Sequence, residues 1–334
     1  MIGRENVMKG NRIIGTGTGV PSRVVTNKDM EKMVDTSDEW IVSRTGIKER
    51  RIAEEHETTS DFCAHAARNA LEMAGVSPEE VDLIIVATLS PDRLIPATAC
   101  IVQSKIGATN AACFDLEAAC SGFVFGLALA NGMMPDQGVK TALVIGAETL
   151  SRVIDWEDRN TCVLFADGGG AVLVRHEGGD RGIISTYMKA DGFAPTPWLC
   201  VEPGVADKTP LGDYHSKDFA IRMMGKDVFK FGVKALPDAV RGALERSGGL
   251  TLDDVDWVIP HQANMRIIDS AAKALDIPYE KFIINLERYG NTSAGTIPIA
   301  LDEANRDGRI KDGDIVALSG FGAGLTWGGA IIRW

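Results

Sequence analysis

Residues 113–134 read CFDLEAACSGFVFGLALANGMM, and this stretch decides the fold that we predict for the chain. Its first part, residues 113–116, has the composition of a buried strand. The part from Gly122 onward is apolar on every side, which is typical of a helix in the middle of a core. Small residues around Cys120 allow the backbone to turn sharply from strand into helix. The stretch therefore predicts that the Cys120 thiol lies at a helix N-terminus on a tight elbow.

Two interpretations of Cys120 remain open at this point. A buried cysteine most often has only a structural role. At a helix N-terminus, however, peptide dipoles and unpaired N–H groups stabilise negative charge, so we expect the thiol pKa to fall from about 8.5 towards neutrality. In this strand–elbow–helix context Cys120 is a candidate nucleophile.

Composition bounds the class of protein. The 334 residues are 45% hydrophobic and can bury a large core, as one long domain or two closely packed ones. The start has no signal-like apolar segment and no run of about 18 apolar residues follows, so we expect a soluble, cytoplasmic protein without a membrane partner. The net charge of −11 argues against nucleic acid. The six cysteines lack metal-binding spacing, so we expect no metal site and no disulfide scaffold.

Three phrases of the first half recur in the same order in the second half. The matched pairs are 75–86 with 249–259, 141–146 with 314–320, and 169–174 with 328–333. Strands alternate with helices in both halves. The pattern predicts two similar α/β units packed together, residues 1–180 and 181–334.

Residues 12–19, RIIGTGTG, resemble a strand followed by a dinucleotide-binding loop. A dinucleotide site needs a helix that begins at the last glycine. Here Pro21 and a second extended segment follow instead, so the motif fails this requirement.

A short helix is predicted between Ser37, which can cap it, and Gly46, which can end it. On that helix Trp40 and Arg44 are four residues apart and share a face. Basic residues follow within 48–51. A ring beside cations can bind a nucleotide and its phosphates, although a solvated charged surface is the commoner meaning of such a run.

Residues 194–220 are rich in proline, glycine and charge, and we predict a long loop that is functional or mobile. Beyond it a helix would align one basic stripe, made of Arg222, Lys226, Lys230 and Lys234. Such a stripe is by itself more often a solvated face. Gly225 and Pro237 predict that this helix is interrupted.

The second half supplies three further candidates. A strand is predicted to end at Pro260 and a helix to begin at His261, where a histidine is biased towards the neutral form and can donate a hydrogen bond. Asn291 either caps a helix or belongs to a site. Residues 319–325, SGFGAGL, are glycine-rich, so backbone N–H groups there can approach a ligand closely.

Together these motifs resemble the β-ketoacyl-[acyl carrier protein] synthase III family, the initiating condensing enzymes of type II fatty acid synthesis. The resemblance runs from about residue 13 to residue 334 and rests on DEWIVSRTGI (38–47), AACSGF (118–123), PHQAN (260–264), GNTSA (290–294) and GFGAG (320–324). It implies an α/β, thiolase-like fold with two duplicated halves in α-β-α-β-α layers. It also implies a catalytic trio of Cys120, His261 and Asn291 between the halves.

Residue types separate this family from its relatives. A thiolase uses a second cysteine near the C-terminus, and this chain has no cysteine after Cys200. Elongating synthases use two histidines, whereas the second position here is Asn291. Plant-type polyketide synthases share the trio but are longer and use coenzyme A esters without a carrier protein. The initiating synthase is therefore the function we predict.

The resemblance implies a ping-pong reaction without a cofactor, in which Cys120 accepts an acyl group from acyl-coenzyme A and malonyl-[acyl carrier protein] then condenses with it. An oxyanion loop is implied at Gly322, Ala323 and Gly324. Coenzyme A binding is implied for Trp40, Arg44, Arg159 and Asn264. An acidic carrier protein would dock on a basic patch that includes Lys230 and Arg266.

The resemblance further implies a homodimer in which Ile95 lines the acyl pocket of the neighbouring subunit. Many relatives have phenylalanine at this position, so Ile95 leaves the preferred primer open. Three other functions are weighed against the synthase: a cysteine hydrolase, a non-catalytic acyl-binding subunit, and an acyltransferase of secondary metabolism with the same fold. The last is the serious alternative.

Overall fold

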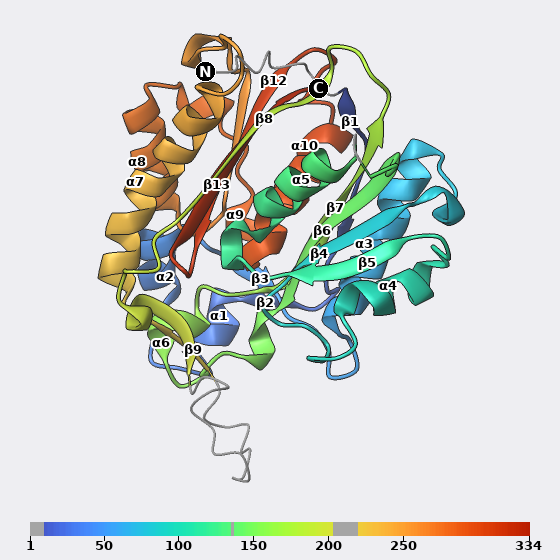
Figure 1. The fold of residues 1–334 in the computed structure, drawn as a ribbon. Coiled ribbons are helices and arrows are strands. Elements are labelled where there is room, and N and C mark those ends of the chain that lie inside the picture. The colour runs from blue at the N-terminus through green and yellow to red at the C-terminus, as the bar shows by residue number, and fades with distance from the viewer. Residues whose placement is uncertain (1–9, 135–136, 203–219) are drawn as a thin grey trace.

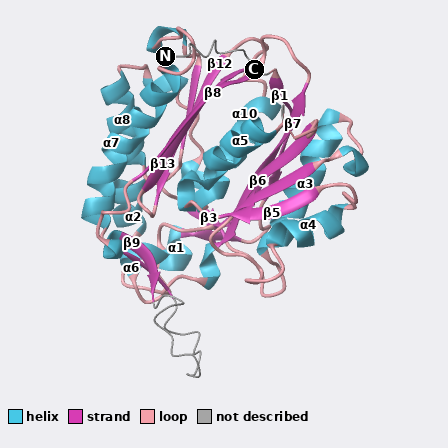
Figure 2. Cartoon of the chain, in the orientation of Figure 1, coloured by secondary structure: helices cyan, strands magenta, loops and turns pink. Residues whose placement is uncertain are grey.

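The computed structural model describes residues 10–134, 137–202 and 220–334. Two twisted sheets enclose a pair of helices and are themselves covered by helices (Figure 1, Figure 2). The strand order is β1-β7-β6-β4-β5 in the first sheet and β11-β12-β13-β8 in the second. Two small sheets, β2–β3 and β9–β10, complete the described strands.

The strands are β1 (Asn11–Gly19), β2 (Val24–Thr26), β3 (Glu49–Arg51), β4 (Leu83–Ala87), β5 (Ala112–Leu116), β6 (Thr141–Thr149), β7 (Asp167–His176), β8 (Gly182–Ala190), β9 (Leu199–Glu202), β10 (Ala220–Met223), β11 (Trp257–Pro260), β12 (Ile315–Gly322) and β13 (Thr326–Arg333). The α-helices are α1 (Asn27–Met30), α2 (Asp38–Thr45), α3 (Thr59–Ala74), α4 (Thr98–Ile106), α5 (Gly122–Met133), α6 (Arg159–Cys162), α7 (Gly225–Leu244), α8 (Met265–Leu275), α9 (Leu286–Tyr289) and α10 (Thr296–Arg306).

The layers follow the order α-β-α-β-α. Helices α3 and α4 cover the outer face of the first sheet, and α7 packs on the outer face of the second with α8 beside it. Between the sheets lie α5 and α10, each of which contacts strands of both (Figure 1). The five layers expected from the resemblance are observed.

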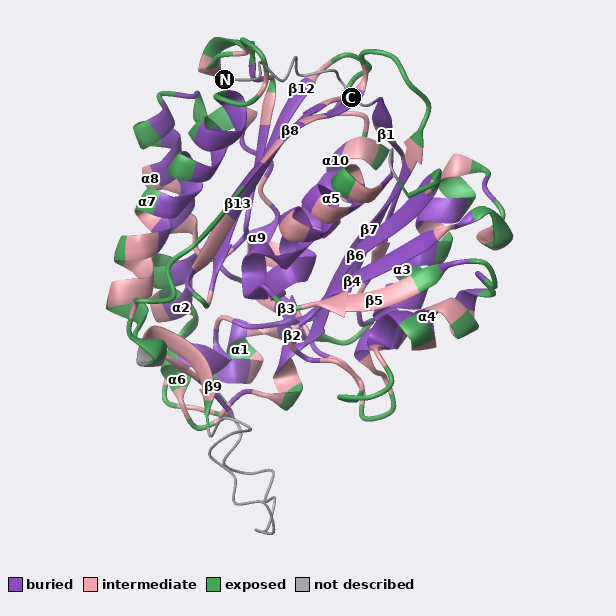
Figure 3. Cartoon of the chain, in the orientation of Figure 1, coloured by how far each residue is buried: buried purple, intermediate pink, exposed green. Residues whose placement is uncertain are grey.

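Helix α5 is buried in the central layer, as its composition predicts (Figure 3). Phe123, Val124 and Leu127 are fully buried and pack in one cluster with side chains of both sheets. Burying each of them contributes roughly 1.5–3 kcal/mol. Within the described ranges, no helix is long and apolar enough to cross a membrane.

Strand β5 covers the predicted segment 113–116, but the expectation that it is buried is wrong. It lies at the edge of the first sheet and pairs only with β4. Ala112 is exposed and the rest of the strand is half-buried (Figure 3). The hydrophobic run therefore forms an open edge of the sheet. Monomeric proteins usually protect such edges from pairing with other chains.

Equivalent hydrogen bonds support the duplication. The Asp82 carboxylate accepts from the backbone N–H of Thr141 at 3.0 Å, and the Asp256 carboxylate accepts from that of Ile315 at 2.8 Å. In each half, an aspartate just before one strand thus accepts a hydrogen bond from the start of the neighbouring strand. The first sheet ends with His176 and the second begins with Gly182. A boundary near residue 180 remains our proposal.

The glycines of residues 12–19 serve helix packing rather than a loop. They belong to β1, and a Cβ atom at Gly15 or Gly17 would lie 2.2 or 2.1 Å from a backbone oxygen of α3. Only glycine permits so close an approach. This explains the motif without a nucleotide.

Two expectations about the basic stripe are wrong. Arg222 lies on β10, where it pairs with Asp155 at 2.8 Å, so it is not part of the helix. Helix α7 begins at Gly225 and continues through Pro237 without interruption. Residues 194–220 are also not one loop, because residues 199–202 form β9, which pairs antiparallel with β10. Residues 203–219 lie outside the described ranges.

Candidate active site

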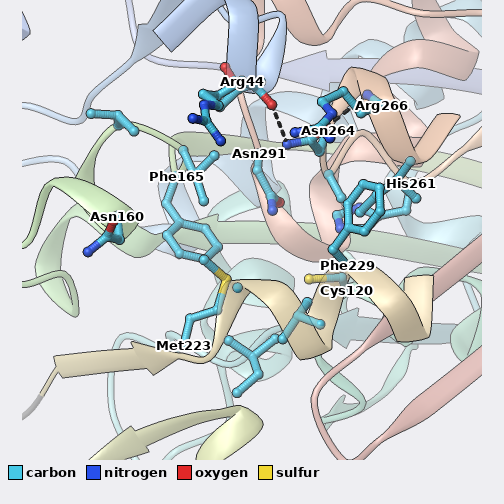
Figure 4. A pocket seen from close by; sticks show the side chains of 18 of the residues that line it. Arg44, Cys120, Asn160, Phe165, Met223, Phe229, His261, Asn264, Arg266 and Asn291 are labelled. Atoms are coloured by element: carbon cyan, nitrogen blue, oxygen red, sulfur yellow. Dashed lines mark hydrogen bonds between the residues drawn. The ribbon is translucent and has the colours of Figure 1, made fainter. Parts of the chain in front are cut away.

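A cavity of about 540 Å³ brings together the three predicted catalytic side chains (Figure 4). Cys120 comes from the turn before α5, His261 follows β11, and Asn291 follows α9. All three are buried, with exposed fractions of 7% or less. One side chain from the first half and two from the second thus converge, as the resemblance implies.

The elbow before α5 is confirmed. A 3-10 turn, Ala119–Ser121, leads directly into the helix. Ala119 has φ +44°, a left-handed conformation that costs a non-glycine residue about 1–3 kcal/mol. Its N–H donates to the Glu117 carboxylate at 2.9 Å. The surrounding structure therefore holds Cys120 on a strained turn at the start of the central helix.

The predicted fall of the Cys120 pKa is wrong for the free protein. Burial raises the pKa of this thiol to about 12, and the nearby Ser293 hydroxyl only partly opposes the effect. The buried carboxyl of Glu148 raises it further. Removal from water disfavours the thiolate more than the helix N-terminus favours it. Cys120 is thus protonated at neutral pH in the free protein.

His261 is neutral for a different reason from the one expected. Burial lowers its pKa to about 3. It does not begin a helix, because α8 starts at Met265 with Asn264 as its N-cap. Its Nδ1 lies 2.7 Å from Thr296 Oγ1, and the Phe321 ring packs edge-on against it at 5.5 Å. The imidazole can therefore present a neutral N–H at pH 7.

Asn291 is held so that its amide nitrogen is available. Its Oδ1 accepts the N–H of Ser293 at 2.8 Å. Its backbone N–H donates to Leu164 O at 2.9 Å and its carbonyl accepts from Ala166 N at 2.9 Å. Because the oxygen is already engaged, Nδ2 is the atom left to donate a hydrogen bond in the cavity.

The glycine-rich loop approaches Cys120 directly. A Cβ atom at Gly322 would lie 2.6 Å from the backbone nitrogen of Cys120, so only glycine fits. Gly322 lines the main cavity and Ala323 lines a smaller one beside it. Gly324 has φ +136°. The loop lies where an oxyanion loop is expected, and its role remains a prediction.

Three of the four predicted coenzyme A residues line the main cavity: Trp40, Arg44 and Asn264. The expected cap and end of α2 are observed, since Ser37 accepts from Trp40 N at 3.1 Å and Gly46 adopts φ +84°. Asn264 donates to Arg44 O at 3.0 Å and thereby links the two halves (Figure 4). Arg159 lies over the Trp40 ring at 5.4 Å.

Two of the basic residues after α2 have partners within the fold. Arg50 is fully buried and donates to Asn27 Oδ1 at 2.9 Å and to Val163 O at 2.9 Å. Lys48 pairs with Glu287 at 2.8 Å. Arg50 therefore has a structural role and Lys48 belongs to a surface ion pair, which favours the interpretation of this run as an ordinary charged surface over a phosphate site.

Two exposed cations line the main cavity and a third follows on α7. Lys226 and Arg266 line the cavity, and Arg266 lies over the Phe229 ring at 5.3 Å. Lys230 is exposed one turn further along α7 and pairs loosely with Asp227 at 3.3 Å. This arrangement is compatible with an acidic partner, and carrier-protein docking remains a prediction.

A second cavity of about 130 Å³ extends from Cys120 and is mainly apolar. It is lined by Leu89, Glu117, Ala119, Cys120, Leu150, Phe165, Leu199, Cys200, Val201, Ile221, Ser293 and Ala323. Ile95 does not line it and is 87% exposed. The cavity has room for a short acyl chain, and residues of β9 and β10 are part of its lining.

Several site residues escaped sequence reasoning. Phe321 belongs to the recognised glycine-rich motif and could have been found there. Thr296 and Phe165 carry no local signal, because both depend on tertiary packing. Glu148 is fully buried, and burial raises its pKa to about 7 although Thr88, Leu89 and Ser90 donate hydrogen bonds to it.

A thiolase-like core with cysteine, histidine and asparagine around one cavity defines a condensing acyltransferase. Residues 114–192 match the family described as 3-Oxoacyl-[acyl-carrier-protein (ACP)] synthase III, and residues 244–334 match its C-terminal family. The Clostridium acetobutylicum β-ketoacyl-[acyl-carrier-protein] synthase III is 53% identical over 331 residues, covering 98% of this chain and 99% of that one. The chain therefore belongs to the β-ketoacyl-[acyl-carrier-protein] synthase III family, and it shares the condensation that initiates type II fatty acid synthesis.

Two solved structures share this fold. The 3-oxoacyl-[acyl-carrier-protein] synthase III from Aquifex aeolicus is 47% identical and superposes with a TM-score of 0.90, covering 97% of this chain and 100% of that one. The priming β-ketosynthase of the R1128 polyketide biosynthetic pathway is 37% identical with a TM-score of 0.91, covering 97% of this chain and 96% of that one.

The raised pKa of Cys120 predicts its reactivity. The rate of alkylation by iodoacetamide should rise about tenfold for each pH unit between about pH 7 and 9, because only the thiolate reacts. Mass spectrometry of the peptide that contains Cys120 measures the rate. A plateau near neutral pH would show instead that the helix N-terminus outweighs burial.

Proposed function

We propose that Cys120 carries the acyl intermediate and that His261 and Asn291 act on malonyl-[acyl carrier protein]. The observation that carries this division is the convergence of three buried side chains on one cavity. A nucleophile needs access to a thioester, whereas the other two side chains are neutral donors. Incubation with malonyl-carrier protein and acyl-coenzyme A primers, followed by mass spectrometry of the products, tests the overall reaction.

In the first half-reaction the Cys120 sulfur attacks the thioester carbonyl of acyl-coenzyme A. A new C–S bond forms, the bond to coenzyme A breaks, and the thiol proton passes in net terms to the departing coenzyme A sulfur. Backbone N–H groups of Cys120 and of the 322–324 loop are proposed to stabilise the oxyanion. The apolar second cavity then holds the acyl chain away from water.

In the second half-reaction malonyl-carrier protein loses CO₂, and its thioester carbonyl becomes an enolate. The Nε2–H of His261 and the Nδ2–H of Asn291 donate to that oxygen, and each contributes roughly 3–4 kcal/mol if it behaves like other oxyanion-hole groups. The enolate carbon attacks acyl-Cys120, which releases the thiolate and gives β-ketoacyl-carrier protein. Neutral donors suit this step because neither has to lose a charge.

We further propose that coenzyme A enters beside α2. Trp40, Arg44 and Asn264 line the main cavity, and Asn264 lies between Arg44 and His261 (Figure 4). A flat adenine ring can stack on the indole, and Arg159 is the cation next to it. A cytoplasmic location, where such thioesters are made, stays part of the proposal.

A second candidate function is the priming of a polyketide pathway. The similarity to the R1128 priming β-ketosynthase favours it, because that structure superposes as well as those of the fatty acid enzymes. Both functions use the same chemistry at Cys120 and differ in the primer and the carrier protein. The product analysis separates them when carrier proteins of both pathways are supplied.

A homodimer is proposed from the exposed edge of the first sheet. Strand β5 has one free edge, and Leu94 and Ile95 on the loop after β4 are 83% and 87% exposed. Two copies that pair along β5 would cover this edge and these side chains. Ile95 could then reach the acyl cavity of the other copy.

The two half-reactions should separate in variants. Cys120→Ser is expected to abolish acylation, because serine is not activated by a dedicated base. His261→Ala and Asn291→Ala should each slow release of labelled CO₂ from malonyl-carrier protein by about 100-fold or more, with acylation of Cys120 retained. Intact-protein mass reports the acyl group. Unimpaired CO₂ release in both variants would remove His261 and Asn291 from the oxyanion role.

Charge reversal should test the basic patch. Lys230→Glu with Arg266→Glu is expected to raise the KM for malonyl-carrier protein by about tenfold or more and that for acyl-coenzyme A only slightly, since such charges act mainly on encounter with the protein partner. Added salt should weaken the wild type more than the variant. Lys273→Glu, at the other end of α8, is the matched control. Equal effects on both substrates would contradict docking.

Ile95 should influence primer choice. A smaller side chain than phenylalanine leaves room, and each buried methylene is worth about 0.8 kcal/mol, so we expect acceptance of primers longer or more branched than acetyl. Ile95→Phe should shift preference towards acetyl-coenzyme A, by about tenfold for each 1.4 kcal/mol by which binding of the longer primer weakens. Competition between acetyl-, isobutyryl- and hexanoyl-coenzyme A measures this, with Met33→Phe as control. A monomer by light scattering would contradict the trans arrangement.

A further inference from the structure

One side-chain contact to His261 has no role in the steps above. Thr296, the first residue of α10, places its Oγ1 2.7 Å from Nδ1 of His261. Both residues are buried, with exposed fractions of 2% and 1%. The histidine backbone is held separately, because its N–H donates to Ser319 O at 2.7 Å. The contact with Thr296 therefore acts on the ring and not on the chain.

The contact matters because a neutral imidazole has only one N–H. The partner of one ring nitrogen decides which nitrogen carries the proton. Burial keeps His261 neutral, so its second nitrogen cannot also be protonated at pH 7. For His261 to donate a hydrogen bond into the cavity, Nε2 has to carry the proton. Nδ1 then has to accept a hydrogen bond from another group.

Thr296 can be that donor. Its hydroxyl has one proton and two acceptors within reach, Nδ1 at 2.7 Å and Ser293 O at 3.0 Å. Ser293 O already accepts the backbone N–H of Thr296. The Ser293 carbonyl thus has a hydrogen-bond partner even without the Thr296 hydroxyl. Of the two contacts of that hydroxyl, the one to the imidazole is shorter.

We propose that Thr296 is a positioning residue that donates to Nδ1 of His261 and so holds the proton on Nε2. The proposal rests on the role of His261 as a hydrogen-bond donor in the second half-reaction. Phe321 packs edge-on against the ring at an interplanar angle of 72° and limits its tilt. Together Thr296 sets the tautomer and Phe321 sets the plane, so the donor is oriented before the malonyl group arrives.

The experiment compares three variants. Thr296→Val removes the hydroxyl and keeps the shape, whereas Thr296→Ser keeps the hydroxyl. Thr292→Val is the matched control, because Thr292 is equally buried and its hydroxyl has no hydrogen-bond partner among the described residues. Each variant is tested for the ¹⁵N signals of His261, for acylation of Cys120, and for CO₂ release from malonyl-carrier protein.

The wild type and Thr296→Ser should show a protonated Nε2 and an unprotonated Nδ1, unchanged between about pH 5.5 and 8. In Thr296→Val we expect a mixture of tautomers. Its kcat for CO₂ release should fall about 10- to 100-fold, the loss seen when partners that orient metal-bound histidines are removed. The KM for malonyl-carrier protein and the rate of acylation should stay within about twofold.

Three results would overturn the proposal. The first is a proton on Nδ1 in the wild type, and the second is an unchanged tautomer in Thr296→Val. The third is that Thr296→Val and Thr296→Ser both lose the two half-reactions to the same extent. The wild-type spectrum decides the assignment even if Thr296→Val does not fold. Failure of the proposed function is distinguishable. If His261→Ala released CO₂ normally while Nε2 carried the proton in the wild type, the catalytic role would fail and the tautomer assignment would stand.

Discussion

The rest of the structure depends on the burial of α5 between the two sheets. A helix that is apolar on every side has no face to turn towards water, so it needs a sheet on each side. Its entry point is thereby confined to the centre of the molecule, where the strained Ala119 is supported by its surroundings. The duplicated halves can both contribute to one site because they share this helix and α10.

The same burial acts on the protonation of three groups near the helix. It keeps the Cys120 thiol and the His261 imidazole uncharged, and it raises the pKa of Glu148. For a histidine that has to donate without carrying charge, a dry site is an advantage. For a nucleophile it is a cost, since the thiolate forms less readily. In the proposed mechanism, the architecture thus favours the second half-reaction and makes the first depend on transfer of the thiol proton.

Local signals predicted local structure well. The elbow at Cys120 and the ends of α2 follow from small residues, caps and glycine, which act within a few residues. Tertiary effects were not predictable in this way. The exposure of β5 depends on which strand lies beside it, and the Cys120 pKa depends on how much water the fold removes. Pro237 remained compatible with a continuous α7, although proline alone predicts a break.

Arg159 resting on Trp40 has a consequence for selectivity. The guanidinium covers a face of the indole, and such a contact is worth about 0.5–1 kcal/mol at an exposed site. A ligand that binds to that face of the indole has to displace the guanidinium. Only a flat aromatic ligand then gives the guanidinium a new ring to pack on. An aliphatic or spherical ligand would break the cation–π contact without forming a new one. We therefore expect the Arg159–Trp40 contact to favour planar rings at the proposed coenzyme A site.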